Sequence, residues 1–81
     1  MNFIVLSKDA EALLEELCQV NQAKGLDEAC NTLLKKQYES PNETKKMELW
    51  SLIEELKEAG CITAKRLGGS GVHYYHLESI K

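Results

Sequence analysis

The sequence has little of several features that mark particular classes of protein. It contains no apolar run near the ~20 residues that a membrane-spanning helix needs, and no internal repeat or low-complexity tract. Its three cysteines are an odd number without Cys-x-x-Cys spacing, which argues against a disulfide framework and against a zinc site. With 81 residues and a net charge of −3, the chain has the length of one domain and is not a strongly cationic nucleic-acid coat protein.

The same absences bear on location and on chemistry. The apolar run Phe3–Leu6 is short, has no basic flank and precedes no small-residue cleavage site, so we do not expect a secretory signal. Unpaired cysteines favour a reducing compartment, and we therefore expect a cytoplasmic protein with Cys18, Cys30 and Cys61 as small, buried, inert residues. No paired carboxylates, Ser-His-Asp set or cofactor loop is present, so we expect no enzyme activity, no cofactor and no metal site.

Hydrophobic periodicity predicts two helices in the first half of the chain. Ser7 is the expected N-cap of the first, and Gly25 is expected to end it. Apolar residues recur at helical spacing between them. The second helix is expected to start at Asp27 as its cap, and a single apolar stripe runs from Leu26 to Tyr38.

A third helix has the clearest start signal in the sequence. Residues 40–43, Ser-Pro-Asn-Glu, match a capping box with proline at the first helical position. This pattern predicts a helix from Pro41 to about Ala59, ended by Gly60, with only about two residues between the second and third helices. Trp50 and Leu56 lie on its apolar side, and both are expected to be mostly buried.

After Gly60 the hydrophobic period changes from 3.6 to 2, which predicts strands. Residues 62–67 and 72–77 are two short runs rich in β-forming residues, and residues 68–71 between them predict a hairpin with a flexible four-residue tip. The apolar run Phe3–Leu6 is compatible with an edge strand or with a flap over the core.

Three helices followed by a β-hairpin is the order of a winged helix-turn-helix, an α+β fold that would occupy residues 1–81 as a single domain. Residues 52–62 resemble the end of a recognition helix entering the first wing strand, and Tyr75-x-Leu77 resembles the second wing strand. Residues 6–14 resemble the first helix of small bacterial and phage winged-helix proteins, including the YjcQ-like group. The usual short strand between the first two helices has no counterpart in residues 21–26, so Phe3–Leu6 is the candidate for a third strand.

This resemblance implies a transcriptional regulator that binds double-stranded DNA, with the third helix in the major groove and the hairpin against the backbone or minor groove. The expected DNA contacts, taken from the third helix and the hairpin, are Thr44, Lys45, Lys46, Ser51, Lys65, Arg66, Ser70 and Tyr74. Lys65 and Arg66 occupy successive strand positions, so at most one of them faces a given partner.

The distribution of charge supports DNA binding in the hairpin. Residues 1–34 carry two basic and six acidic residues, whereas residues 35–81 carry eight basic and seven acidic ones. Residues 62–77 include Lys65, Arg66 and two histidines but no acidic residue. A locally basic wing is what neutralisation of DNA phosphates requires.

The third helix gives the opposite evidence. Helical spacing places four glutamates, at positions 48, 54, 55 and 58, on the arc opposite its apolar side, where they would repel phosphate. A second hypothesis therefore stays open, in which the domain is a protein-interaction module. Its acidic third helix would then bind a basic or apolar protein partner or a second copy of itself, without DNA.

Overall fold

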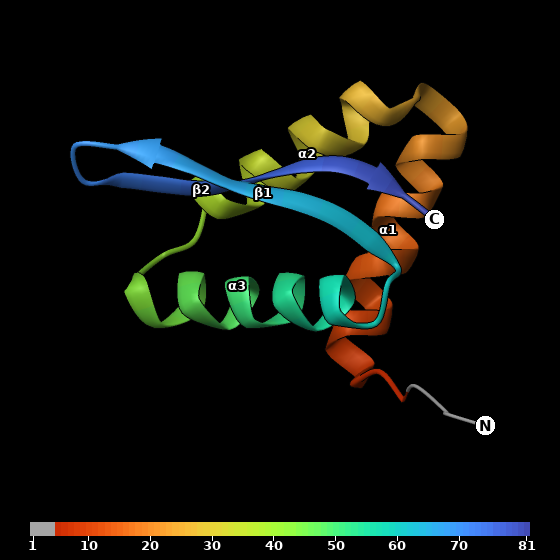
Figure 1. The fold of residues 1–81 in the computed structure, drawn as a ribbon, viewed down its shortest axis with the longest axis horizontal. Coiled ribbons are helices and arrows are strands. Elements are labelled where there is room, and N and C mark those ends of the chain that lie inside the picture. Colours follow the sequence, from red (N-terminus) through yellow and green to blue (C-terminus); the bar gives the residue numbers. More distant parts are fainter. Residues whose placement is uncertain (1–4) are drawn as a thin grey trace.

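Three helices precede a two-stranded antiparallel hairpin in the computed structural model, which describes residues 5–81 (Figure 1). The elements are α1 (Lys8–Lys24), α2 (Leu26–Tyr38), α3 (Glu43–Glu58), β1 (Ile62–Gly69) and β2 (Val72–Ile80). This α+β order is that of a winged helix, as the sequence predicts. No helix within residues 5–81 is long and apolar enough to cross a membrane.

The first helix begins and ends where the sequence predicts. The Ser7 hydroxyl oxygen accepts a hydrogen bond from the Ala10 N–H at 3.2 Å, as an N-cap side chain does. Gly25, at φ +98°, is the single residue between α1 and α2. The predicted Asp27 cap is wrong: α2 already begins at Leu26, with Gly25 at its N-cap position and no capping side chain.

The predicted start of the third helix is also wrong by two residues. Asn42 is the N-cap, and its Oδ1 accepts a hydrogen bond from the Lys45 N–H at 2.9 Å. The Ser40 hydroxyl instead donates to the Lys36 carbonyl at 3.1 Å, back toward α2. Pro41 therefore lies before the helix, and four residues separate α2 from α3 instead of two. Asparagine is at least as good an N-cap as serine, so Asn42 can cap α3 in place of the predicted Ser40.

The predicted cap, Ser40, and the observed cap, Asn42, give a direct stability test. Asn42→Ala should lower the free energy of unfolding by about 1 kcal/mol, because the Lys45 N–H loses its side-chain acceptor. Ser40→Ala is the matched control and should cost less, since its hydroxyl only adds a bond to a helical carbonyl. Urea unfolding midpoints measure both. A larger loss for Ser40→Ala would show that α3 is capped as the sequence alone suggests.

The hairpin is longer and its turn tighter than predicted. Strand pairing continues to Gly69 and Val72, so the turn contains only Ser70 and Gly71. Both have positive φ, +44° and +87°, as the favoured two-residue hairpin turn requires. Gly68, at φ +139°, lies so close to the Val72 carbonyl that no Cβ fits there. Of the four residues predicted as a flexible tip, Gly68 and Gly69 therefore belong to β1, and only Ser70 and Gly71 form the turn.

The expected third strand is not formed by the part of Phe3–Leu6 that the structure describes. Val5 and Leu6 belong to neither a helix nor a strand, and Asn2, Phe3 and Ile4 lie outside the described residues. Within residues 5–81 the sheet has two strands. Leu6 packs against the core while Val5 is exposed, so within the described residues the flap alternative holds for Leu6 and not for Val5.

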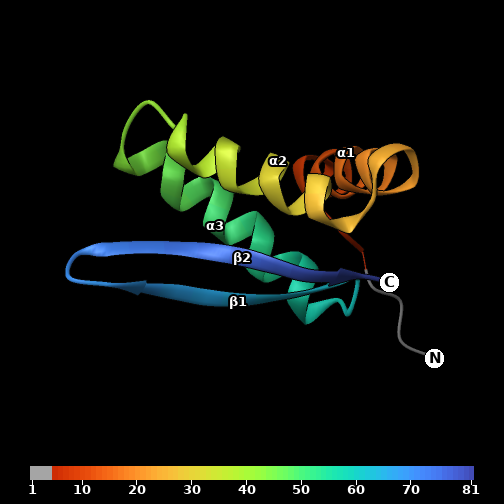
Figure 2. The same cartoon turned by 90° about the horizontal axis from the view of Figure 1, so that it is seen from above.

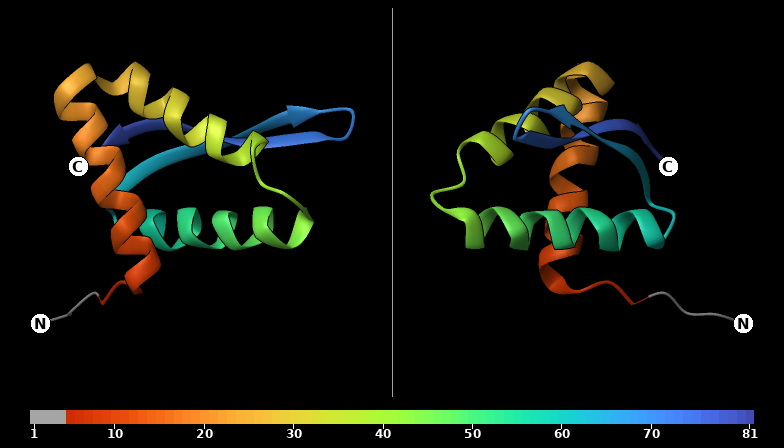
Figure 3. Two further views of the ribbon diagram at one scale, coloured as in Figure 1. Left: turned by 180° about the vertical axis from the view of Figure 1, so that it is seen from behind. Right: turned by 60° about the vertical axis from the view of Figure 1, so that its left-hand side comes forward.

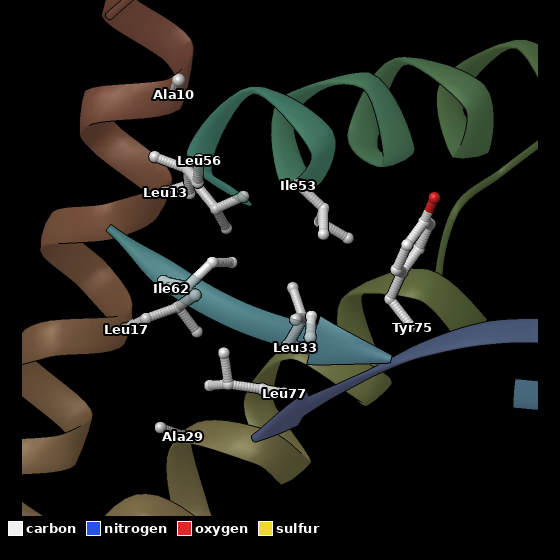
Figure 4. Packing of buried hydrophobic residues seen from close by; sticks show 11 residues of the cluster. Ala10, Leu13, Leu17, Ala29, Leu33, Ile53, Leu56, Ile62, Tyr75 and Leu77 are labelled. Atoms are coloured by element: carbon white, nitrogen blue, oxygen red, sulfur yellow. The ribbon is translucent and has the colours of Figure 1, made fainter. Parts of the chain in front are cut away.

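All five elements contribute to one core (Figure 4). The hairpin lies across one side of the helices, with β2 packed against α2 and β1 against α3 (Figure 2). Leu56 is completely buried, as predicted, at the end of α3 that packs against α1. The fully or largely buried hydrophobic residues are Ala10, Leu13, Leu17, Ala29, Leu33, Ile53, Leu56, Ile62, Ala64, Tyr75 and Leu77.

Candidate nucleic-acid interface

The hairpin is attached to the helices by one buried glutamine. Gln37, at the end of α2, is 4% exposed. Its Oε1 accepts hydrogen bonds from the Tyr75 N–H at 2.8 Å and from the Trp50 indole N–H at 3.0 Å. Its amide nitrogen donates to the Tyr75 carbonyl at 2.9 Å and to the Leu33 carbonyl at 3.2 Å. Gln37 thus satisfies the free edge of β2 as a neighbouring strand would, and fixes β2 and α3 to α2.

The apolar stripe predicted for the second helix does not extend to Tyr38. Tyr38, predicted on the apolar stripe of the second helix, is 69% exposed, while Gln37 is buried. Gln37 follows Leu33 by four residues, so helical spacing put both on the same side. A glutamine is needed there because the position faces backbone N–H and C=O groups of β2, which an apolar side chain leaves unsatisfied.

Two cations lie over the indole ring of Trp50. The Lys46 ammonium is 5.1 Å and the Arg66 guanidinium 4.8 Å from the ring centroid. Tyr75 packs edge-on against the same ring, at 5.8 Å between centroids. Trp50 itself is half-buried, less than predicted, and these two charged side chains supply part of its cover. Since Arg66 faces α3, Lys65 at the next position points to the opposite side of the hairpin, as expected.

Glu54, on the predicted acidic arc, contacts the hairpin although its side chain is still half-exposed. Its carboxylate accepts a hydrogen bond from the Tyr75 hydroxyl and forms an ion pair with Lys57 at 3.4 Å. Tyr75 extends from β2 toward α3 to make this contact (Figure 4). The hydrogen bond from Tyr75, assisted by Lys57, holds the pKa of Glu54 below its usual value. Burial, together with that hydrogen bond, raises the pKa of Tyr75.

These pKa directions predict how stability changes with pH. A carboxyl group whose folded pKa is lowered adds stability above its unfolded pKa, and this stability is lost as the pH falls through the folded pKa. The stability difference between wild type and Tyr75→Phe should therefore be largest near neutral pH and shrink below about pH 4. Tyr38→Phe, at an exposed tyrosine, is the control and should show no such trend. A pH-independent difference for Tyr75→Phe, from urea unfolding, would contradict the assignment.

Glu55 is also occupied within the molecule. One carboxylate oxygen accepts a hydrogen bond from the Ser7 N–H at 2.6 Å and the other from the Ser7 hydroxyl at 3.0 Å. Glu55 thus fixes the start of α1 to α3. Glu48 forms an exposed ion pair with Lys45 at 3.3 Å, and Glu58 is exposed. Within residues 5–81, no hydrogen bond or ion pair joins Glu48 or Glu58 to another element.

The eight predicted DNA contacts fall into three groups. Lys46 and Tyr74 line a hollow of about 340 Å³ between the end of α2, the start of α3 and the start of β2, and Arg66 meets Lys46 at the Trp50 ring. A shallow hollow on the outer side of α3 is lined by Thr44, Lys45 and Ser51, together with Met47, Glu48 and Glu55. Lys65 and Ser70 are exposed on the hairpin.

The first half of α3 and the hairpin tip lie at the same end of the molecule (Figures 1 and 3). The α1–α2 junction lies at the opposite end (Figures 1 and 2). A winged helix presents a helix and a wing to one duplex in this way. Lys45, Lys46, Lys65 and Arg66, which are four of the ten basic residues, are all on these two elements.

Comparison with known proteins gives no relative from which a role could be transferred. No family model matches the chain, and no match was found among curated proteins or among solved structures. Within residues 5–81, no three His, Cys, Asp or Glu side chains are grouped so that they could hold a metal ion. A functional assignment therefore depends on the geometry of α3 and the hairpin.

Proposed function

We propose that this chain binds double-stranded DNA as a small winged-helix regulator. The first half of α3 would face the major groove with Thr44, Lys45 and Ser51, and the hairpin would meet the flanking backbone with Lys65 and Ser70. The observation that supports this most strongly is that the first half of α3 and the hairpin tip, on the two elements that carry the four basic residues among the predicted contacts, lie at the same end of the molecule. Lys57 offsets the charge of Glu54, whereas Glu55 still lines the hollow on the outer side of α3.

Asp9, Glu55 and Glu48 line the same hollow as the proposed contacts of α3, and the acidic residue that pairs directly with one of those contacts is Glu48. Its ion pair with Lys45 is exposed on both sides, with about 60% of each side chain accessible. Such pairs are worth about 0–1 kcal/mol, so Lys45 can leave Glu48 for a phosphate at little cost. Glu48 remains as a local repulsion. Its neutralisation should therefore strengthen DNA binding.

The charged ends of Lys46 and Arg66, which lie over the Trp50 ring, can also leave their contacts for a phosphate at little cost. An exposed cation–π contact is worth about 0.5–1 kcal/mol, and the side chains of Lys46 and Arg66 are long enough to redirect their charged ends. Lys46 lines the hollow between α2, α3 and β2, and Arg66 lies over the same Trp50 ring as Lys46. Lys46 therefore adds positive charge beside the first half of α3 without itself specifying a sequence. Arg66 points to the side of the hairpin opposite Lys65, so a duplex that contacts Lys65 would not contact Arg66 as well.

The hairpin has the rigidity that a wing needs. Its two-residue turn keeps the strands paired to the tip, and Gln37 fixes β2 to α2. Lys65 forms no ion pair within the part of the chain that the structure describes, so its ammonium group is free to contact phosphate. The wing would therefore supply charge from a fixed position relative to α3.

Fluorescence anisotropy of a labelled duplex of random sequence tests the proposal. Wild type should bind at low salt, and Lys65→Ala should weaken binding to every sequence alike, since a phosphate contact carries no base information. Lys24→Ala, in the last turn of α1 at the end away from the hairpin tip, is the matched control and should bind as wild type does. Equal losses for the two variants would show that the hairpin is not the contact.

A second candidate function is association through the outer side of α3. Met47 is 63% exposed there, next to Glu48 and the half-buried Leu52 in the shallow hollow. An exposed methionine beside acidic side chains suits a second copy of the chain or a basic or apolar protein partner. Glu48→Gln separates the two functions: it should strengthen DNA binding under the first, and weaken association measured by sedimentation under the second.

A further inference from the structure

Two reactive side chains that are far apart in the sequence meet between α2 and β2. The Cys30 sulfur lies 3.2 Å from Nδ1 and 3.9 Å from Nε2 of His76. Cys30 is on the side of α2 that faces the hairpin, and His76 follows Tyr75 in β2. The sequence predicts that all three cysteines are buried and inert. All three are in fact half-buried, and Cys30 is the one with an imidazole within hydrogen-bond distance.

We propose that Cys30 is a site of covalent thiol modification, with His76 as the base and a low-molecular-weight disulfide as the co-reactant. Thiol attack requires loss of the thiol proton, and a hydrogen-bonded imidazole is the side chain that most often accepts it. With its proton on Nε2, His76 presents an unprotonated Nδ1 to the thiol. His76 is exposed, so a small molecule can reach the pair from solvent.

The exchange balances without any further reagent. The Cys30 proton moves to Nδ1 of His76 as the sulfur attacks one sulfur of the disulfide. The disulfide S–S bond breaks, a new S–S bond forms to Cys30, and the released thiolate takes the proton back from the imidazolium. The products are a mixed disulfide at Cys30 and one free thiol.

The position of Cys30 links this chemistry to the hairpin. Cys30 and Gln37 are seven residues apart on α2, and their partners His76 and Tyr75 are adjacent in β2. A mixed disulfide would place a bulky group in the packing between α2 and β2. We therefore expect it to loosen the attachment of the hairpin, and reduction to restore it. The thiol exchange itself does not depend on whether the protein binds DNA.

Glutathione disulfide is the probe for this site, with the modified cysteine identified by peptide mass spectrometry. Cys30 should be modified at least about tenfold faster than Cys18 and Cys61, which are half-buried like it but lack an imidazole partner within residues 5–81. His76→Gln should reduce the rate at Cys30 to that of the other two cysteines.

His73→Gln is the matched control, because it removes the other histidine of the same strand, three residues away and exposed. It should leave the rate at Cys30 unchanged. Circular dichroism confirms that each variant is folded. A rate at Cys30 no faster than at Cys18 and Cys61, or one that His76→Gln leaves unchanged, would overturn the proposal.

Discussion

Leu56→Ala is expected to lower the free energy of unfolding by about 2–5 kcal/mol, the largest effect of any substitution considered for this chain. The side chain is fully buried at the end of α3, where that helix packs against α1. Truncation removes apolar contacts and leaves a cavity that the surrounding helices and hairpin can only partly close. Because so small a domain has little stability to lose, this variant should be partly or wholly unfolded at 37 °C.

Met47→Ala is the matched control for this change. Met47 lies on the same helix but is 63% exposed, so its truncation should alter stability by no more than about 0.5 kcal/mol. Urea unfolding followed by circular dichroism measures both variants. A loss below about 1 kcal/mol for Leu56→Ala would show that the buried face of α3 is assigned incorrectly.

Gln37→Ala should be the second most damaging change, lowering the free energy of unfolding by about 2–4 kcal/mol. It leaves the Tyr75 N–H and carbonyl and the Trp50 indole N–H without their partner, in a place largely shielded from water. Each unsatisfied group carries its own desolvation cost. The hairpin should also detach more readily from α2, and hydrogen exchange at the Tyr75 amide should become faster than in wild type.

Gln22→Ala is the same chemical change at an exposed position of α1 and serves as the control. It should leave both the unfolding midpoint and the exchange rate of the Tyr75 amide near those of wild type. If Gln37→Ala behaves as Gln22→Ala does in both measurements, Gln37 is not the residue that attaches the hairpin.

Local sequence signals predict the elements of this fold well. The apolar period of 3.6 gives three helices, the change to period 2 gives the hairpin, and Ser7 and Gly25 bound the first helix as predicted. Each of these signals acts between residues close in sequence, so no knowledge of the tertiary structure is needed. The same is true of the burial of Leu56, which follows from its place on the apolar stripe.

The misassigned details depend on partners distant in sequence or on a choice between near-equal caps. Asn42 and Ser40 are both good N-caps, and only the structure shows that Ser40 bonds back to Lys36. Gln37 is buried because the edge of β2 lies across it, 38 residues later in the chain. The four-residue spacing of Gln37 from Leu33 indicates the buried side of α2, but a polar residue is not counted in an apolar stripe.

The candidate site was predictable in composition but not in arrangement. The basic residues of the hairpin and of the start of α3 are visible in the sequence, and the structure brings them to one end of the molecule. The sequence could not show that Glu54 meets Tyr75 or that Glu55 meets Ser7. Those two contacts, across 21 and 48 residues, fix the orientation of two of the four glutamates that the sequence places on the outer side of α3.

The central claim, that α3 and the hairpin together bind duplex DNA, is tested most directly by the salt dependence of binding. Wild type should bind a random duplex at low salt, with log K falling linearly against log salt. The slope should become shallower by about 0.9 for each phosphate that the protein no longer neutralises, hence by about 1.8 in Lys45→Ala with Lys65→Ala. A wild-type protein without DNA affinity at low salt, which gains none in Glu48→Gln, would contradict the claim.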